Sequence, residues 1–383
     1  MKSLNCKKVK GYIEGYYGKL LSWNDRYEIL DTLYKNKMNF YFYCPKEDLN
    51  HRLNWREPYD KKWLDNFYKF ILYAKQKKIK IIAGLSPGIN FDFQSYSKGD
   101  KTDLIFLTNK LKTFLKKSVD HVAILFDDIP NDFNLKVQNK EEGKIHSDIV
   151  NNSINILKKS IFTVPRIYSD ELVIENKKYL DVFLTNINKN AYIFYTGKYI
   201  VSDSFSSKQK AINQKISDNK IIFWDNFYAN DYCPKRLFVG PWKNKNLIDK
   251  SMINGTGMIQ TDKLLIEIVN KTASNKNQFL EWKNILLDNK VPKEFFKICS
   301  PFLSPNLTFQ KKIKNFKYSN ITYKSLDHLL WKWKSALARE WYPFLLNFKH
   351  DLQFLDKKLE FIRVLKTQTN PMQKILQERR NLK

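Results

Sequence analysis

Eight short apolar runs, each separated from the next by a longer polar stretch, most constrain what this chain can fold into. The runs are rich in β-branched and aromatic residues, as buried strands are. They occupy residues 9–17, 39–46, 79–88, 121–129, 161–169, 191–197, 220–227 and 255–261. Eight buried strands alternating with helices over about 280 residues are typical of a (β/α)8 TIM barrel. We therefore predict an α/β fold of this kind.

The intervening segments carry the spacing of amphipathic helices. The first begins at Ser22, and Asp25 three residues later completes a variant of the capping box. Further helices are predicted at 61–75, 102–117, 147–159, 176–184 and 206–216, with a short one at 246–252. A doubly wound open sheet is the alternative, but it needs a glycine-rich turn after the first strand. Tyr16 and Tyr17 stand there instead, which favours the barrel.

The pattern changes after residue 277. A helical segment at 278–287 leads to a Pro- and Asn-containing stretch, and long helical stripes follow. The first stripe contains Leu326, Leu330, Trp333, Leu337 and Trp341. A second stripe lies beyond Pro343, which should break or kink the helix. We predict a catalytic barrel at 1–276 and a C-terminal α-helical domain, a bundle with a polar tail, at 277–383.

Charge suggests a nucleic-acid binder at first, because 67 lysines and arginines against 39 acidic residues give a net charge of +28. Only nine of those cations are arginine, the side chain best suited to phosphates and base edges. A basic stripe on one face and a steep salt dependence of binding would be required. Lysines spread along the predicted helices indicate a solvated surface, so nucleic acid is not the expected partner.

Cysteine and histidine usage predicts neither a disulfide framework nor a metal site. The four cysteines are far apart and the five histidines are scattered. No cofactor is expected. The N-terminus lacks the apolar region of a secretory signal, and no apolar stretch is long enough to span a bilayer. We expect a soluble, cytoplasmic protein with no membrane partner.

Polar side chains stand where the predicted strands end, which in a barrel is the face that carries the active site. The pair Asp127–Asp128 directly follows five apolar residues, 122–126. Neighbouring carboxylates resist ionising together, so one can keep a proton and act as a general acid. The alternative is that one aspartate only caps the next helix. Carboxylates, amides and aromatic rings at the other strand ends favour a sugar pocket.

The adjacency of the two aspartates also constrains the mechanism. Retaining and inverting glycosidases usually hold two carboxyls about 5–9.5 Å apart, on opposite sides of the scissile bond. Neighbours on one strand end are poorly placed for that arrangement. They suit the substrate-assisted exception, in which a 2-acetamido carbonyl of the sugar is the nucleophile.

Six motifs resemble glycoside hydrolase family 84, the O-GlcNAcase and bacterial β-N-acetylglucosaminidase family. They are GYIEGYYGKLLSW, YCPKEDLNHRLNWREPY, GLSPG, ILFDDIP, YTGK and FWDNFYANDYCPKRLFVGPW, which run in family order from residue 11 to 242. The resemblance implies a retaining exo-β-N-acetylglucosaminidase that removes terminal β-linked GlcNAc from a glycoside or glycoprotein through an oxazoline. Asp127 would orient the acetamido group, and Asp128 would be the general acid and base.

The resemblance also implies which residues hold the sugar. Gly15 and Lys46 match positions that contact sugar hydroxyls, and Tyr168 matches the aromatic residue of the acetamido pocket. Trp224, Asn226 and Asp231 match positions around the acetyl group and the outer hydroxyls. Without the resemblance, Lys46 could equally be a solvated lysine and Trp224 a core residue. His51, Arg52, Trp55 and Arg56 also match, and we interpret them as loop scaffold.

The sequence departs from the family at three places. Arg166 and Ile167 replace the usual Thr-Glu before the pocket tyrosine, and Asn90 follows GLSPG, two residues on, where aspartate is common. The eighth strand should deliver an asparagine to the sugar, whereas our eighth run ends at Thr261. A catalytically weakened module that binds GlcNAc or glycoproteins is therefore the alternative function. The natural aglycone and the oligomeric state do not follow from the sequence.

Overall fold

The computed structural model describes residues 8–129, 139–202, 220–233, 235–242, 249–272, 277–299, 303 and 319–360. The chain divides into two compact units. The first comprises residues 1–226 and 247–257, and the second comprises residues 227–246 and 258–383. The boundary predicted at residue 276 stays a prediction.

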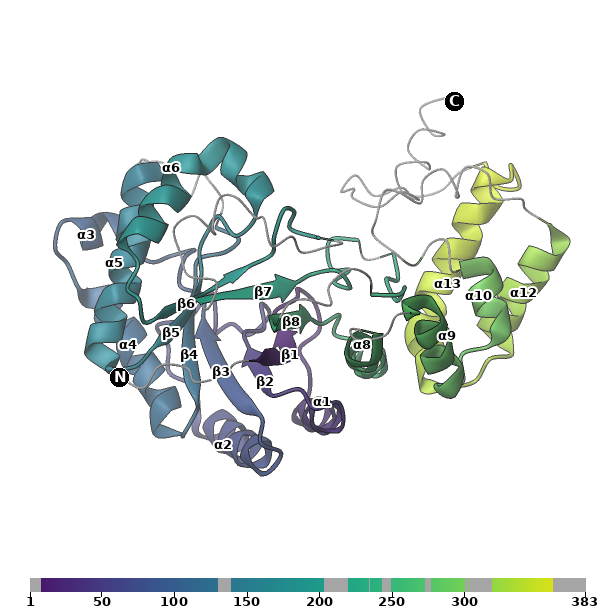
Figure 1. Cartoon of the computed structure of the whole chain (residues 1–383), viewed down its shortest axis with the longest axis horizontal. Coiled ribbons are helices and arrows are strands. Elements are labelled where there is room, and N and C mark those ends of the chain that lie inside the picture. Colours follow the sequence, from purple (N-terminus) through teal and green to yellow (C-terminus); the bar gives the residue numbers. More distant parts are fainter. Residues whose placement is uncertain are drawn as a thin grey trace. The chain divides into compact units, whose positions relative to one another are not determined.

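The first unit is a closed barrel of eight parallel strands (Figure 1), which confirms the predicted (β/α)8 fold. Each strand pairs with the next in sequence, and β1 pairs with β8 to close the ring. The strands are β1 (Val9–Glu14), β2 (Phe40–Tyr43), β3 (Lys80–Leu85), β4 (His121–Leu125), β5 (Ile161–Val164), β6 (Ala191–Tyr195), β7 (Ile221–Asp225) and β8 (Lys250–Asn254).

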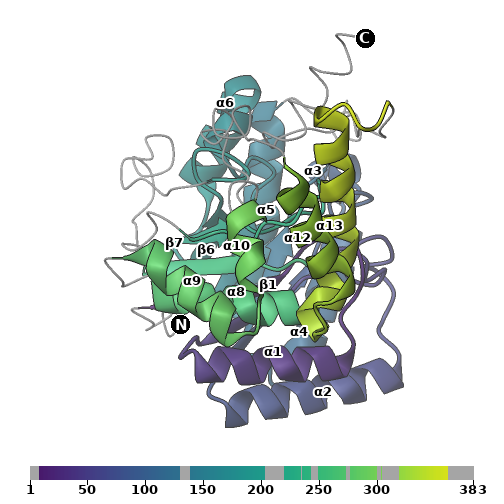
Figure 2. The ribbon, with the colours of Figure 1, turned by 90° about the vertical axis from the view of Figure 1, so that its right-hand side faces the viewer.

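Helices lie outside the ring of strands, and α1 and α2 run side by side in both views (Figures 1 and 2). Ser22 caps α1 through the amide of Asp25, whose side chain accepts from the Ser22 amide, so the predicted capping box is confirmed. The predicted helix at 206–216 lies outside the described residues. The helices of this unit are α1 (Trp23–Lys35), α2 (Lys61–Gln76), α3 (Phe93–Ser97), α4 (Thr102–Lys116), α5 (Asn139–Leu157) and α6 (Asp170–Asn186).

Aromatic side chains from opposite strands fill the barrel. Phe42 and Phe194 stack with their centroids 5.1 Å apart, and the Trp224 ring meets both at 5.8 Å. Such buried aromatic pairs add about 0.5–1.5 kcal/mol each beyond the area they bury. Gly11 has no room for a side chain, because a Cβ there would lie 2.1 Å from the Phe40 carbonyl oxygen. The filled core leaves the strand ends to form the site.

The eighth strand is not where the sequence pattern indicates. β8 spans Lys250–Asn254, whereas the predicted run 255–261 forms a turn and the start of helix α8 (Ile259–Thr272). The short helix predicted at 246–252 is therefore wrong as well, since its last residues belong to the strand. The apolar run of β8 is only Met252 and Ile253, flanked by polar residues that the ladder accommodates. An apolar run of two residues is too short for β8 to be recognised as a strand from the sequence.

The second unit is helical in its C-terminal part. Helix α12 (Asn320–Trp331) packs against α10 (Lys293–Cys299) and α13 (Ala336–Leu355), and α8 packs against α9 (Gln278–Asp288). Figure 2 shows α12 and α13 adjacent. The stripe that the sequence predicts as one helix is interrupted between α12 and α13, where Ser335 caps the second helix. Pro343 lies inside α13 and does not end it, so of the predicted break or kink the break is wrong.

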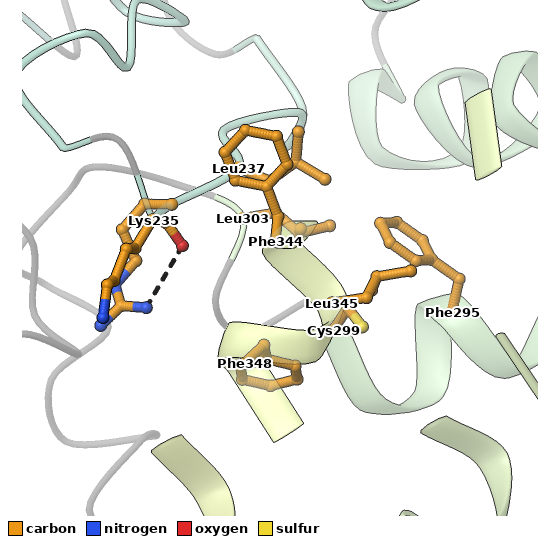
Figure 3. A pocket seen from close by; sticks show the side chains of 9 residues that line it. Lys235, Leu237, Phe295, Cys299, Leu303, Phe344, Leu345 and Phe348 are labelled. Atoms are coloured by element: carbon orange, nitrogen blue, oxygen red, sulfur yellow. Dashed lines mark hydrogen bonds between the residues drawn. The ribbon is translucent and has the colours of Figure 1, made fainter. Parts of the chain in front are cut away.

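An apolar pocket lies within this second unit (Figure 3). Its volume of about 40 Å³ is enough for one or two water molecules. Phe295, Leu345 and Phe348 are among its lining side chains, and Arg236, which also lines the pocket, forms an ion pair with Asp351. The pocket offers no carboxylate among its lining residues. We assign no chemistry to it.

Within the described part of the chain, every helix is too short or too polar to cross a bilayer.

Candidate active site

The carboxylate pair lies immediately beyond strand β4, at the carboxyl end of the barrel. The Phe126 amide still bonds to the Val164 carbonyl of β5, and the chain then turns away from the sheet. Asp127 is buried, and Asp128 adopts a left-handed conformation with φ of 56°. Aspartate is one of the few residues that visit this region readily. The turn therefore follows directly from the last buried residue of the strand.

Lys46, from the end of β2, bridges the two carboxylates. Its Nζ donates to Asp127 Oδ2 at 2.5 Å and lies 3.7 Å from Asp128 Oδ2. The lysine side chain is almost fully buried. Although burial would lower the pKa of Lys46, Asp127 and Asp128 raise it above its ordinary value. The alternative of a solvated lysine is wrong, because this side chain is the counter-ion of the pair.

Two tyrosine hydroxyls hold the second carboxylate. Tyr17, after β1, donates to Asp128 Oδ2 at 3.0 Å, and Tyr168, after β5, donates to Asp128 Oδ1 at 3.1 Å. The Asp128 side chain keeps 30% of its surface exposed, against 8% for Asp127. Asp127 Oδ1 is buried and has no hydrogen-bond partner among the described residues. The pair thus offers one buried acceptor without a described hydrogen bond, Asp127 Oδ1, and one partly exposed carboxylate, that of Asp128.

Burial and neighbours separate the pKa values of the two aspartates. Burial raises the pKa of Asp127, and the adjacent Asp128 adds to this against the opposing effect of Lys46. Burial would also raise the pKa of Asp128, but Lys46 and the hydroxyls of Tyr17 and Tyr168 lower it below its ordinary value. Because the two groups interact, they titrate as one unit. In the ligand-free site, a single proton on the pair favours Asp127.

Strands β1, β7 and β8 contribute a connected set of amides. The Gly15 amide donates to Asn254 Oδ1 at 3.2 Å, and Asn254 Nδ2 donates to Asn226 Oδ1 at 3.0 Å. Trp224 Nε1 donates to the same Asn226 oxygen at 2.8 Å. Gly15 is required because a Cβ there would lie 2.5 Å from the Trp224 ring. Trp224 thus belongs both to the core and to the polar network above it.

Asn254 corrects the departure that the sequence suggests at the eighth strand. Thr261 does not end that strand, since it lies in α8, where its hydroxyl donates to Glu340 and accepts from Trp341 Nε1. The strand ends in an asparagine after all, followed by Gly255. An asparagine at the end of a buried run is the signal that could have identified it.

Asp231 belongs to the second unit, in the turn that follows Asn226. Its Oδ1 accepts from the Tyr232 amide at 2.9 Å. The assignment of Asp231 to the outer sugar hydroxyls stays a prediction.

Two residues close to the pair, Tyr17 and Arg52, are not predicted as site residues from the sequence. The sequence analysis assigns Tyr17 to a turn and Arg52 to the loop scaffold. Tyr17 contacts Asp128 directly, as described above. Arg52, in the loop between β2 and α2, places its guanidinium 5.1 Å from the Tyr17 ring centroid and donates to the Asp128 carbonyl at 3.4 Å. An arginine in a loop that follows a site-bearing strand end is the only sequence signal for it.

Buried side chains fix the loop that carries Lys46 and Arg52. Lys110 of α4 donates to the backbone carbonyls of Asn50, Trp55 and Glu57. Burial lowers the pKa of Lys110 to about 8. Trp55 Nε1 in turn donates to Asn90 Oδ1, and Asn90 Nδ2 donates to the Leu53 carbonyl, a bond that the family's aspartate could not make. The loop is therefore held from within the barrel unit.

The other departure from the family pattern also has a partner. Arg166 forms a buried, two-pronged ion pair with Glu142 of α5. The backbone amide of Arg166, which is two residues before Tyr168 in the sequence, donates to the Tyr179 hydroxyl. The Tyr168 backbone is held in turn by the Thr196 amide.

Among the residues that the structure describes, no group of three or more histidine, cysteine, aspartate or glutamate side chains is placed to hold a metal ion.

A closed (β/α)8 barrel with a paired carboxylate at its carboxyl face is an arrangement that a glycoside hydrolase can use, and the family comparison assigns the chain to that class. The family model for β-N-acetylglucosaminidase matches residues 10–262. The chain therefore belongs to the β-N-acetylglucosaminidase family, and the predicted relationship to glycoside hydrolase family 84 is confirmed.

Known proteins agree with this assignment. The chain is 28% identical to protein O-GlcNAcase of Mus musculus over 248 residues, which is 62% of the chain and 26% of that protein. The protein O-GlcNAcase of Rattus norvegicus is 27% identical over the same length. The chain thus spans about a quarter of the curated relatives that it matches.

Solved structures share the fold. An O-GlcNAc hydrolase of Thermobaculum terrenum superposes with a TM-score of 0.73 at 22% identity, covering 91% of this chain and 83% of that one. CpGH84B superposes with a TM-score of 0.70 at 20% identity, covering 92% of this chain and 70% of that one.

Proposed function

We propose that this chain is a retaining exo-β-N-acetylglucosaminidase that hydrolyses terminal β-linked GlcNAc on a glycoside or glycoprotein by substrate-assisted catalysis. The observation that carries the proposal is the Lys46-bridged pair, in which Asp127 keeps a buried, unpartnered Oδ1 and Asp128 reaches the surface. The family assignment supports the same chemistry.

The position of the pair argues against a direct enzymic nucleophile. Asp127 and Asp128 are consecutive on one turn, and both approach the same ammonium of Lys46. A glycosidase that uses two carboxyls needs them on opposite faces of the sugar. The structure therefore supports a nucleophile that the substrate brings, the carbonyl of its 2-acetamido group.

The reaction then takes two displacements at C1. In the first, the acetamido oxygen bonds to C1 while the C1–O bond to the aglycone breaks. Asp128 gives its proton to the leaving oxygen, and Asp127 takes the acetamido N–H proton through its Oδ1, which leaves a neutral oxazoline. In the second, water attacks C1, Asp128 takes the water proton, the oxazoline C1–O bond breaks, and Asp127 returns its proton to the nitrogen. Two inversions give net retention.

Contacts with the substrate have to favour the proton on Asp128, because in the ligand-free pair Asp127 has the higher pKa of the two. An acetamido N–H donated to Asp127 would stabilise the ionised form of that carboxyl. The glycosidic oxygen can only accept, so it favours the protonated form of Asp128. The two contacts act in the same direction. The bound sugar thus favours the protonated form of Asp128, which is the form that acts as the general acid.

The remaining contacts support a pocket for one terminal sugar. Gly15, Trp224, Asn226 and Asn254 form a hydrogen-bonded network at the ends of β1, β7 and β8, the face of the barrel that also carries the pair. An aromatic face and amide groups are suited to a pyranose ring and its hydroxyls. Tyr168 lies against the core cluster that contains Trp224 and suits the methyl side of the acetamido group.

Turnover of an aryl β-GlcNAc glycoside by the full chain tests the proposal. Asp128→Asn should abolish turnover of substrates with poor leaving groups, and Asp128→Asn protein should still bind a thiazoline mimic of the intermediate. Binding of the mimic by wild type without any turnover would refute the enzyme assignment. The alternative of a weakened binding module has lost its motivating observation, because Asn254 ends the eighth strand.

A further inference from the structure

Arg52 lies beside the proposed general acid and forms no ion pair with a described carboxylate, although its charge helps to lower the pKa of Asp128. Its guanidinium stacks on Tyr17, whose hydroxyl holds Asp128, and one Nη2 donates to the Asp128 backbone oxygen at a long 3.4 Å. The Arg52 side chain is half-buried, and its Nε is buried without a hydrogen-bond partner among the described residues. Most of its five donors are therefore available.

The other buried or half-buried arginines of the described residues are all neutralised. Arg26 pairs with Glu14, Arg56 with Asp103, Arg166 with Glu142 and Arg236 with Asp351. Taking a charge partly out of water is unfavourable unless an opposite charge compensates it. A site that keeps an unpaired guanidinium at its reacting edge is prepared for an anion supplied by a ligand.

The position of Arg52 identifies which part of the ligand would bring that anion. In the proposed reaction Asp128 faces the glycosidic oxygen, so the first atoms of the aglycone lie next to Asp128 and Tyr17. A guanidinium binds a planar carboxylate through two parallel hydrogen bonds. We propose that Arg52 binds a carboxylate of the aglycone and makes the enzyme prefer GlcNAc linked to an acidic partner. This inference rests on the proposed function.

A pair of small substrates tests this preference without assuming the natural one. The 3-carboxyphenyl and 3-carbamoylphenyl β-GlcNAc glycosides differ in charge but little in shape. Wild type should turn over the carboxylate with the higher kcat/KM, and the advantage should shrink as salt rises. Arg52→Gln should reduce the ratio of the two kcat/KM values by about tenfold, the effect of one charge-assisted hydrogen-bonded contact.

Arg56→Gln is the matched control. It removes the same charge from the same loop but from a residue that is paired with Asp103. The carboxylate-to-amide ratio should remain that of wild type. Arg52→Lys, which keeps the charge and loses the fork, should retain part of the preference. It also serves if Arg52→Gln does not fold.

An unchanged ratio in Arg52→Gln, or no advantage of the carboxylate in wild type at low salt, would overturn the inference. Turnover of both substrates in that case leaves the glycosidase assignment intact. If neither glycoside is hydrolysed, the proposed function fails, and calorimetric binding of the same two compounds still decides on Arg52. A lactyl-bearing amino-sugar aglycone and an acidic glycopeptide, compared next, distinguish the natural sources of the carboxylate.

Discussion

Lys46 Nζ donates a 2.5 Å hydrogen bond to Asp127 Oδ2, across 81 residues of sequence. This contact joins the ends of β2 and β4 and neutralises a carboxylate that the barrel otherwise buries. Both members are almost inaccessible to water. The ammonium therefore offsets negative charge on the carboxylate pair before any substrate enters.

Lys46→Met should impair catalysis and raise the apparent pKa values of the aspartate pair. Without the ammonium, the hydroxyls of Tyr17 and Tyr168 and the charge of Arg52 still stabilise the Asp128 carboxylate, but the buried Asp127 carboxylate loses its hydrogen-bonded counter-ion. Breaking a buried ion pair also destabilises a fold by about 3 kcal/mol. We expect kcat/KM to fall about 100-fold or more, with the acidic limb of its pH profile moved upward. Lys46→Arg should recover part of both effects, and a Lys46→Met protein with wild-type kcat/KM would contradict this account.

Tyr168→Phe should move the alkaline limb of the pH profile of kcat upward, because Asp128 must be protonated to act as the general acid. The Tyr168 hydroxyl donates to the ionised form of Asp128, so its removal favours the protonated form and raises the pKa. A shift of up to about one unit corresponds to about 1.4 kcal/mol. The control is Tyr195→Phe, which removes a hydroxyl bound to Asp170 instead. Equal limbs in wild type and Tyr168→Phe would show that the hydroxyl does not stabilise the carboxylate.

Asn254→Ala and Thr261→Val distinguish the observed end of the eighth strand from the predicted one. Asn254 loses its bonds to the Gly15 amide and to Asn226, which should lower kcat/KM about tenfold or more. Thr261→Val removes one of the three hydrogen bonds to the Glu340 carboxylate and the acceptor of Trp341 Nε1 in the second unit, so it should lower the melting temperature and leave kcat/KM near wild type. A fall in kcat/KM for Thr261→Val, with kcat/KM of Asn254→Ala near wild type, would instead assign Thr261 to the site.

Stability should fall on mild acidification, in part through His51. Burial lowers the pKa of His51 to about 4, and its Nδ1–H donates to the Gly84 carbonyl. The unfolded chain, with a histidine pKa near 6.5, then binds more protons than the folded one below about pH 6.5. The free energy of unfolding contributed by neutral His51 is complete above that pH and is lost as the pH falls toward 4. At pH 5 the loss is about 2 kcal/mol.

Urea unfolding at pH 8 and pH 5 measures this contribution. His51→Asn keeps a donor to the carbonyl and does not titrate, so its stability should change less between the two pH values than that of wild type. His350→Asn alters an exposed histidine and should behave like wild type. Equal pH dependence in wild type and His51→Asn would exclude His51 as the cause.

Seven of the eight strands follow from the sequence, because each places a nearly continuous apolar run inside a ring that is buried on both faces. The position of the carboxylate pair also follows from the sequence, because the carboxyl ends of the strands in such a barrel form the face that carries the active site. Strand β8 does not follow from the sequence. Its apolar run is short, and its stability comes from backbone pairing with the neighbouring strands. The helix break before Ser335 is likewise set by packing, as the leucine and tryptophan stripe continues through it.

The contacts that give the site its chemistry are long-range and cannot be predicted from spacing. Nothing in the sequence near Arg52 indicates that its guanidinium reaches the Tyr17 ring, or that Tyr17 holds Asp128. Motif resemblance identified Lys46 as a sugar contact, whereas the fold makes it the counter-ion of the pair. Such pairings depend on how the loops return over the barrel mouth, which local periodicity does not encode.

The central claim is that the acetamido group of the substrate is the nucleophile. Its most direct test is kcat/KM for aryl β-glycosides whose 2-acetamido group carries zero, one, two or three fluorines, with one aryl leaving group throughout. Each fluorine weakens the carbonyl as a nucleophile, so this account predicts a steep, progressive fall in kcat/KM. A kcat/KM that does not change with fluorination, together with a glycosyl group covalently trapped on Asp127 or Asp128, would contradict it.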